Sequence, residues 1–170
     1  AQATGAILLF VPLDQNGELD VSGLDSIFSE RTRLLAISAM SNVTGYMPPL
    51  DALIDAARKA GAVIYLDGAQ LVSHHPVDLR QLDVDFLSFS AHKMLGPTGV
   101  GVLYGRESIL EEMDPFLYGG DMIDTVYADH STWDRVPQKF EAGTPNIAGV
   151  IGFGAALRYL QAYGLQAIAA

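Results

Sequence analysis

The sequence contains no cysteine among its 170 residues. This absence excludes a disulfide framework, a thiolate metal site and a cysteine nucleophile within these residues. Positive charge is also scarce, because ten lysine and arginine residues stand against twenty aspartate and glutamate residues, for a formal net charge of −10. Such a chain has no basic stripe for a polyanion, so we expect neither nucleic acid nor an anionic membrane surface as a partner.

Long hydrophobic runs are absent as well. No apolar stretch approaches the ~18 residues that a membrane span needs, and the start "AQATGAILLF" lacks the basic region that opens a signal peptide. The simplest prediction is a cytoplasmic protein. Hydrophobic residues make up 49% of the chain, which is enough for one packed core. Because the first residue is not methionine and the last residues continue a predicted helix, we expect a piece of a longer protein.

Apolar runs of strand length alternate with segments of helical periodicity. We predict strands over 6–12, 33–40, 62–68, 84–90 and 99–105, and helices over 22–29, 49–60, 107–113 and 147–163. This alternation predicts βαβ units, and therefore an α/β fold in which a mostly parallel sheet has helices on both faces. Residues 114–146 form a long polar and aromatic stretch, which in a compact domain is usually functional or covers another subunit.

In such sheets, ligands bind beyond the carboxyl ends of the strands, so the residues that follow each strand are the candidate site. The chemistry-bearing residues at these positions are Asn42, Asp67, Gln70, Ser90, His92 and Lys93. The set combines an amine that can form an imine, a carboxylate, an amide and two donors suited to a phosphate. This combination predicts pyridoxal phosphate as the ligand.

Lys93 is the residue on which this hypothesis depends. It comes directly after a predicted buried strand and just before the turn Gly96-Pro97-Thr98-Gly99. We therefore expect a fixed, desolvated lysine, which favours the neutral, nucleophilic amine. The alternative is an ordinary solvated surface lysine.

The other candidate residues also have simpler explanations. Opposite a pyridine nitrogen, Asp67 would keep the ring protonated, but it is equally placed to end a strand in a turn or to cap a helix. Ser90 and His92 fit a phosphate or a plain turn. The pair His74-His75 lacks a nearby carboxylate triad, and "GPTGVG" lacks the ending of a nucleotide phosphate loop, so we predict neither a metal site nor a nucleoside triphosphate.

Four stretches together resemble a known family. "SNVTG", "YLDGAQLVSHHPVDL", "DFLSFSAHKMLGPTGVGVLYG" and "FEAGTPNIAGVIGFGAAL" are similar to the group II, SUF-type cysteine desulfurases of the class V aminotransferase family. The resemblance implies pyridoxal 5'-phosphate as cofactor, the large domain of the fold type I PLP-dependent transferases, and conversion of L-cysteine to L-alanine with sulfur passed on for iron–sulfur cluster assembly. Residues 1–170 would be the central portion of that large domain, without its N-terminal segment and the C-terminal small domain.

The resemblance also implies roles for matching residues around the cofactor ring. Lys93 would carry the Schiff base and act as catalytic acid and base. Asp67 would pair with the pyridinium nitrogen, and Gln70 would donate a hydrogen bond to the phenolic oxygen. Asn42 would lie near the cofactor oxygen and the substrate.

The phosphate and the partners follow from the same resemblance. Ser90 and His92 would hold the phosphate, and Thr144 would reach the phosphate of the neighbouring subunit, which implies a homodimer. The resemblance further implies a sulfur-accepting cysteine, which these residues do not contain, and it makes a separate sulfur-acceptor protein a candidate partner.

Two alternatives stay open at this stage. Other class V enzymes, such as a selenocysteine lyase, an epimerase or a carbon–sulfur lyase, share the lysine stretch. A domain that folds around the sheet without binding cofactor would also explain the sequence.

Overall fold

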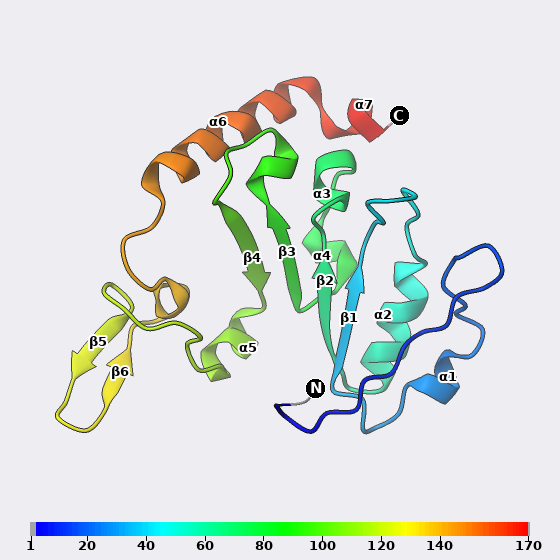
Figure 1. Cartoon of the computed structure of the whole chain (residues 1–170), viewed down its shortest axis with the longest axis horizontal. Coiled ribbons are helices and arrows are strands. Elements are labelled where there is room, and N and C mark those ends of the chain that lie inside the picture. The colour runs from blue at the N-terminus through cyan, green and yellow to red at the C-terminus, as the bar shows by residue number, and fades with distance from the viewer. Residues whose placement is uncertain (1–2, 170) are drawn as a thin grey trace.

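The computed structural model describes residues 3–169 and has a four-stranded sheet at its centre (Figure 1). The sheet has the order β1-β2-β3-β4, from β1 (Leu34–Ser38), β2 (Val63–Asp67), β3 (Phe86–Ser90) and β4 (Gly101–Gly105). Strands β1, β2 and β3 are parallel, and β4 is antiparallel to β3. The predicted α/β fold with a mostly parallel sheet is therefore confirmed.

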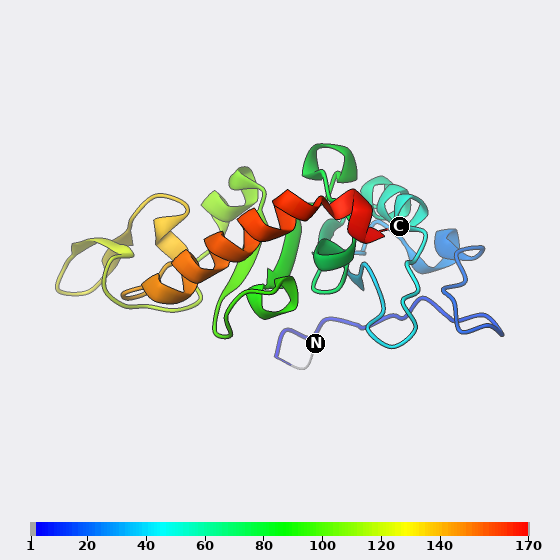
Figure 2. The same ribbon diagram turned by 90° about the horizontal axis from the view of Figure 1, so that it is seen from above.

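Helices and turns lie before, between and after the strands along the chain. They are α1 (Leu24–Ile27), α2 (Leu50–Lys59), α3 (Leu71–His74), α4 (Leu79–Leu82), α5 (Glu107–Glu112), α6 (Ile147–Tyr163) and α7 (Leu165–Ala169), with 3-10 turns η1 (Ala91–Met94) and η2 (Gln138–Phe140). Helix α6 crosses the end of the sheet in Figure 1, and Figure 2 shows α2 and the N-terminal segment on opposite sides of the sheet. None of these described helices is long and apolar enough to cross a membrane.

The core forms where α2 packs on the parallel strands. Leu53 and Ala57 of α2 and Ile64 and Leu66 of β2 are all 0% exposed and belong to one cluster. Burying a leucine or isoleucine side chain contributes about 1.5 to 3 kcal/mol, so the periodic apolar positions of α2 and β2 stabilise this pairing. Asp51 in the first turn of α2 and Lys59 in the last complement the helix dipole.

The predicted strand over 6–12 is wrong. No strand pairs with this segment in the described part of the chain, and the one bridge nearby joins Leu13 to Leu19. Its four large apolar side chains, Ile7 to Phe10, are between 61% and 77% exposed. An apolar run predicts burial, but a strand also needs a neighbour for its backbone hydrogen bonds, and the described residues do not supply one.

The long stretch 114–146 contains a small hairpin of its own. Strands β5 (Ile123–Val126) and β6 (Ser131–Trp133) pair antiparallel, and η2 follows them. Figure 1 shows the hairpin standing away from the four-stranded sheet. The rings of Tyr118 and Trp133 pack 5.1 Å apart, centroid to centroid, so the aromatic residues of this stretch partly pack on one another.

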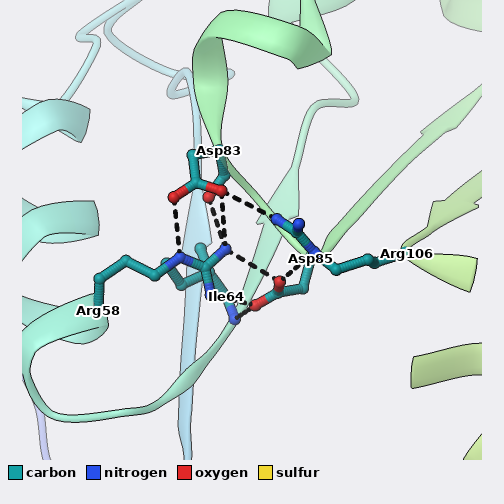
Figure 3. A network of polar contacts seen from close by, with 5 residues as sticks. All are labelled: Arg58, Ile64, Asp83, Asp85 and Arg106. Atoms are coloured by element: carbon teal, nitrogen blue, oxygen red, sulfur yellow. Dashed lines mark hydrogen bonds and ion pairs between the residues drawn. The ribbon is translucent and has the colours of Figure 1, made fainter. Parts of the chain in front are cut away.

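A buried carboxylate ties the amino ends of β2 and β3 to α2 and to the end of β4 (Figure 3). The Asp85 side chain is 3% exposed. Its oxygens accept hydrogen bonds from Arg58 Nη1 at 2.7 Å, the Ile64 amide at 2.8 Å and Arg106 Nε at 2.9 Å. Asp83 accepts from both arginines at the surface. With a fourth bond from Arg58 Nη2 at 2.9 Å, each oxygen of the Asp85 carboxylate accepts from two donors.

The donors around Asp85 decide its protonation state. Burial raises the pKa of the Asp85 carboxyl, but the hydrogen bonds from Arg58 and the Ile64 amide outweigh burial and leave the pKa below its ordinary value. Folding therefore favours the ionised form. This stabilisation is fully present above the unfolded-state pKa of about 3.9 and is lost as the pH falls through the folded-state pKa.

We expect Asp85→Asn to lower the free energy of unfolding by about 3 kcal/mol, because two arginines would lose their buried partner. Asp129→Asn makes the same chemical change at a side chain that is 87% exposed and contacts His130. This control should change stability by less than about 0.5 kcal/mol. Urea unfolding followed by circular dichroism measures both variants, and equal losses would contradict the role assigned to Asp85.

We also expect the free energy of unfolding to fall as the pH drops below about 4. There the two aspartates, Asp83 and Asp85, bind protons more readily in the unfolded chain than in the folded one. Both carboxyls have lowered pKa values beside Arg58 and Arg106. The measurement is urea unfolding across a pH series. The acid decline should be shallower in Asp85→Asn, and an unchanged slope would show that other carboxyls dominate it.

Candidate functional site

A hollow of about 220 Å³ lies at the carboxyl ends of β1 and β2. Its lining residues are Ser38, Met40, Asn42, Asp67, Ala69, Gln70 and Lys93. Four of the residues predicted from the strand ends are in this list: Asn42, Asp67, Gln70 and Lys93. They come together because Ser38 and Asp67 are register partners, which places the ends of the two parallel strands side by side.

Asp67 is held at the end of β2 by its neighbours. Its Oδ1 accepts a hydrogen bond from the Ala69 amide at 2.9 Å, and its backbone carbonyl accepts from Ala39 at 2.8 Å. The next amide, that of Gly68, donates to the Ser88 carbonyl at 2.9 Å. No residue in 3–169 donates to Oδ2, so one carboxylate oxygen remains available to a ligand in the hollow.

Asn42 lies on a short loop that follows β1. The Ser41 hydroxyl accepts hydrogen bonds from the Val43 and Thr44 amides, each at 3.2 Å, and the Ser41 amide donates to the Tyr46 carbonyl at 2.9 Å. These local bonds form a closed turn of the kind that serine favours. The turn holds an exposed Asn42 at the wall of the hollow.

Lys93 is carried by η1, between β3 and β4. The turn is closed by the Ala91 amide, which donates to the Val100 carbonyl at 3.0 Å, and by the Gly96 amide, which donates to the Ala91 carbonyl at 2.9 Å. The predicted fixed turn is therefore present. The predicted desolvation is absent, because the Lys93 side chain is exposed in this chain, and its amine bonds to none of the described residues.

The glycine-proline turn after Lys93 is packed against α6. A Cβ added to Gly96 would lie 2.9 Å from both the Ala91 carbonyl oxygen and the Phe153 ring, so only glycine fits there. Asn146 caps α6, because its Oδ1 accepts from the Gly149 amide at 3.0 Å, and its Nδ2 donates to the Gly99 carbonyl at 3.4 Å. The lysine turn and the first turn of α6 thus hold each other in place.

Three predicted residues do not line the hollow. Ser90 is half-buried at the end of β3, His92 is exposed in η1, and Thr144 is exposed on the loop before α6. Their roles in holding a phosphate stay predictions. Conversely, the hollow includes Ser38 and Met40, which sequence reasoning did not select. Both lie at the end of the strand predicted over 33–40, whereas the strand-end rule considered only residues that follow a strand.

The chain matches one protein family over its whole length. The family model of the class-V aminotransferases matches residues 1–170. The chain belongs to this family. Curated cysteine desulfurases from Escherichia coli (strain SE11) and Shigella flexneri are each 51% identical to this class-V chain over 166 residues, which are 97% of the chain. The chain spans 41% of the length of either protein.

Solved structures give the same picture of the class-V fold. The cysteine desulfurase CsdA (S-sulfonic acid) from Escherichia coli has a TM-score of 0.94 and 48% identity, covering 98% of this chain and 42% of that one. The apo cysteine desulfurase from Thermococcus onnurineus NA1 has a TM-score of 0.90 and 38% identity, covering 97% and 41%. The cystine C-S lyase C-DES, in complex with its product cysteine persulfide, has a TM-score of 0.79 and 28% identity, covering 92% and 43%.

The contact between α6 and the lysine turn makes a prediction about two glycines of the same helix. A Cβ on Gly149 would lie 2.6 Å from Val100 Cγ2 and 2.5 Å from Asn146 Nδ2, whereas the nearest atom to a Cβ on Gly154 is 3.7 Å away. We expect Gly149→Ala to lower the free energy of unfolding by about 1 to 3 kcal/mol through overpacking. Gly154→Ala should be neutral or should stabilise by up to about 1 kcal/mol, because alanine favours helix.

Urea unfolding followed by circular dichroism measures both glycine variants. If the two substitutions changed stability in the same direction by the same amount, the close approach of α6 to the turn would be refuted.

Proposed function

We propose that this chain is the central portion of the cofactor-binding large domain of a PLP-dependent cysteine desulfurase. One observation carries the proposal: Lys93, Asp67, Gln70 and Asn42, which come from separate segments of the chain, line a single hollow at the edge of the sheet. Relatives that are 51% identical and named cysteine desulfurase support the same assignment.

The donor set of the hollow fits pyridoxal phosphate. Lys93 supplies the amine that an aldehyde requires, and it has no competing partner among the described residues. Asp67 presents a free carboxylate oxygen for a protonated ring nitrogen, and Gln70 presents an amide for the phenolic oxygen. The hollow, at about 220 Å³, is smaller than the roughly 300 to 1,000 Å³ of typical ligand sites, so this chain would cover the cofactor only in part.

Each residue then has a defined task. When bound, pyridoxal phosphate supplies a protonated ring that withdraws electrons from the Cα of an amino acid. Asp67 holds the proton on the ring nitrogen, because a carboxylate beside a pyridinium favours the charged form. Lys93 moves protons to and from the substrate Cα as acid and base. Asn42 and Gln70 orient the substrate and the cofactor oxygen.

The phosphate would be held by residues outside the hollow. Ser90 precedes the turn of Lys93 and His92 lies in it, and their hydroxyl and imidazole suit phosphate oxygens. Thr144 is exposed on the loop before α6 and does not line the hollow of its own chain. We assign it to the cofactor phosphate of a neighbouring subunit in a homodimer.

The proposed substrate is L-cysteine, and the products are L-alanine and a persulfide. The Cβ–S bond breaks, the sulfur atom bonds to the sulfur of an acceptor thiol, and the proton of that thiol ends on Cβ. These 170 residues contain no cysteine, so the acceptor thiol is not among them. The corresponding biological role is that of a group II enzyme, which passes this sulfur to iron–sulfur cluster assembly in the cytoplasm.

Among the alternatives, a carbon–sulfur lyase is supported by the structural likeness to C-DES. That relative is 28% identical, against 48% for the Escherichia coli desulfurase. The difference favours desulfurase.

The cofactor assignment is tested by trapping the imine. The chain has three lysines, Lys59, Lys93 and Lys139. We expect pyridoxal phosphate followed by borohydride to label Lys93 in preference to the others, as peptide mass spectrometry would map. Lys93→Arg should abolish the specific label, whereas Lys59→Arg, at an exposed position of α2, should leave it unchanged. Equal labelling of the three lysines would overturn the assignment and favour a domain that binds no cofactor.

A further inference from the structure

Helix α3 carries a side-chain clamp on the carbonyl of Gln70. The helix is a single turn, and Gln70 is its N-cap residue. Two side chains from the end of the turn reach back to the Gln70 carbonyl oxygen: the Ser73 hydroxyl at 3.0 Å and His74 Nδ1 at 2.7 Å. The same His74 nitrogen lies 3.0 Å from the Ser73 hydroxyl.

The chemistry of these atoms decides the proton positions. A carbonyl oxygen only accepts, so both Ser73 Oγ and His74 Nδ1 must donate to it. His74 therefore carries a proton on Nδ1, and its Nε2 has no partner among the described residues on an exposed side chain. Once the Ser73 hydroxyl has donated its proton, its oxygen can accept from the same Nδ1–H.

The clamp matters because a single helical turn is not stable by itself. Isolated helices shorter than about 12 residues are marginal in water, so the orientation of a four-residue helix depends on contacts around it. α3 lies against η1, the turn that carries Lys93. The Gln70 side chain lines the hollow with Asp67 and Lys93, so movement of the Gln70 backbone moves an amide out of the site.

We propose that His74 is a positioning residue of the site: by holding the Gln70 carbonyl it fixes where the Gln70 side-chain amide lies in the hollow. The histidine pair, for which the sequence predicts no metal site, thus has a positioning role that belongs to its first member alone. No described atom bonds to the His75 ring, which makes His75 a matched control. The inference rests on the proposed function only for its effect on cofactor binding.

The clamp itself is tested without cofactor. Nitrogen–proton correlation spectra of the histidine rings should show His74 with its proton on Nδ1 in the chain as it stands. In His74→Phe, the Gln70 side-chain amide resonances should move toward those of an unstructured chain, and in His75→Phe they should not. A His74 ring protonated on Nε2 alone would overturn the proposal, whatever the chain does with pyridoxal phosphate.

The effect on the site is tested by absorbance titration with pyridoxal phosphate. We expect His74→Phe, which keeps the ring but loses the donor, to weaken binding about threefold to tenfold, the range of one hydrogen bond. His74→Asn, whose amide nitrogen occupies the place of Nδ1, should restore affinity to within about twofold. His75→Phe should bind like the unmodified chain. We expect the visible band of the bound cofactor to shift in the same direction in His74→Phe and in Gln70→Ala.

A double-mutant cycle separates positioning from general destabilisation. In a Gln70→Ala background, His74→Phe should cause no further loss of affinity, because there is no amide left to position. An equal loss in both backgrounds, or an equal loss in His75→Phe, would overturn the proposal. Absence of binding by the unmodified chain would instead count against the proposed function, and the ring spectra would still decide whether the clamp exists.

Discussion

Asp85 is a carboxylate almost out of contact with water, and the fold brings three groups of donors to it. Removing such a charge from water costs several kcal/mol unless hydrogen bonds replace the solvent. The replacements come from Arg58 on α2, from the Ile64 amide in β2 and from Arg106 after β4. These bonds satisfy the charge, and they hold α2, β2, β3 and β4 together where β2 and β3 begin (Figure 3).

At the opposite end of the sheet, charged groups are left without partners among the described residues. There the ends of β1 and β2 lie level, and Lys93 and one oxygen of Asp67 meet no partner in the described chain. Satisfied charges at one end stabilise the sheet, and unsatisfied groups at the other end are what chemistry on a ligand requires. Local contacts keep these groups placed: Asn146 and Gly96 hold the lysine turn on α6, and the bonds of Ser41 hold the loop of Asn42.

Much of this could be predicted from the pattern of residues. Apolar patterns located α2 and the four strands of the main sheet. Burial follows the helical period on α2 and alternates along β2, as those patterns require. The strand-end rule selected Asn42, Asp67, Gln70 and Lys93 for one site. The segment 6–12 was mispredicted, because hydrophobicity reports a tendency to be buried and carries no information about which backbone will pair with it. The hairpin inside 114–146 has only four and three residues per strand, too few for a clear period.

By itself, the sequence determined the fold class, a mostly parallel sheet and four of the residues that line the hollow. These depend on the spacing of apolar residues and on the chemistry of single side chains, both of which are written along the chain. Tertiary structure alone decided that Lys93 is exposed, that Asn146 joins the lysine turn to α6, that Asp85 is the buried charge and that His74 holds Gln70. Each of these depends on how the elements pack together. The apolar pattern does not specify which polar groups come into contact when they do.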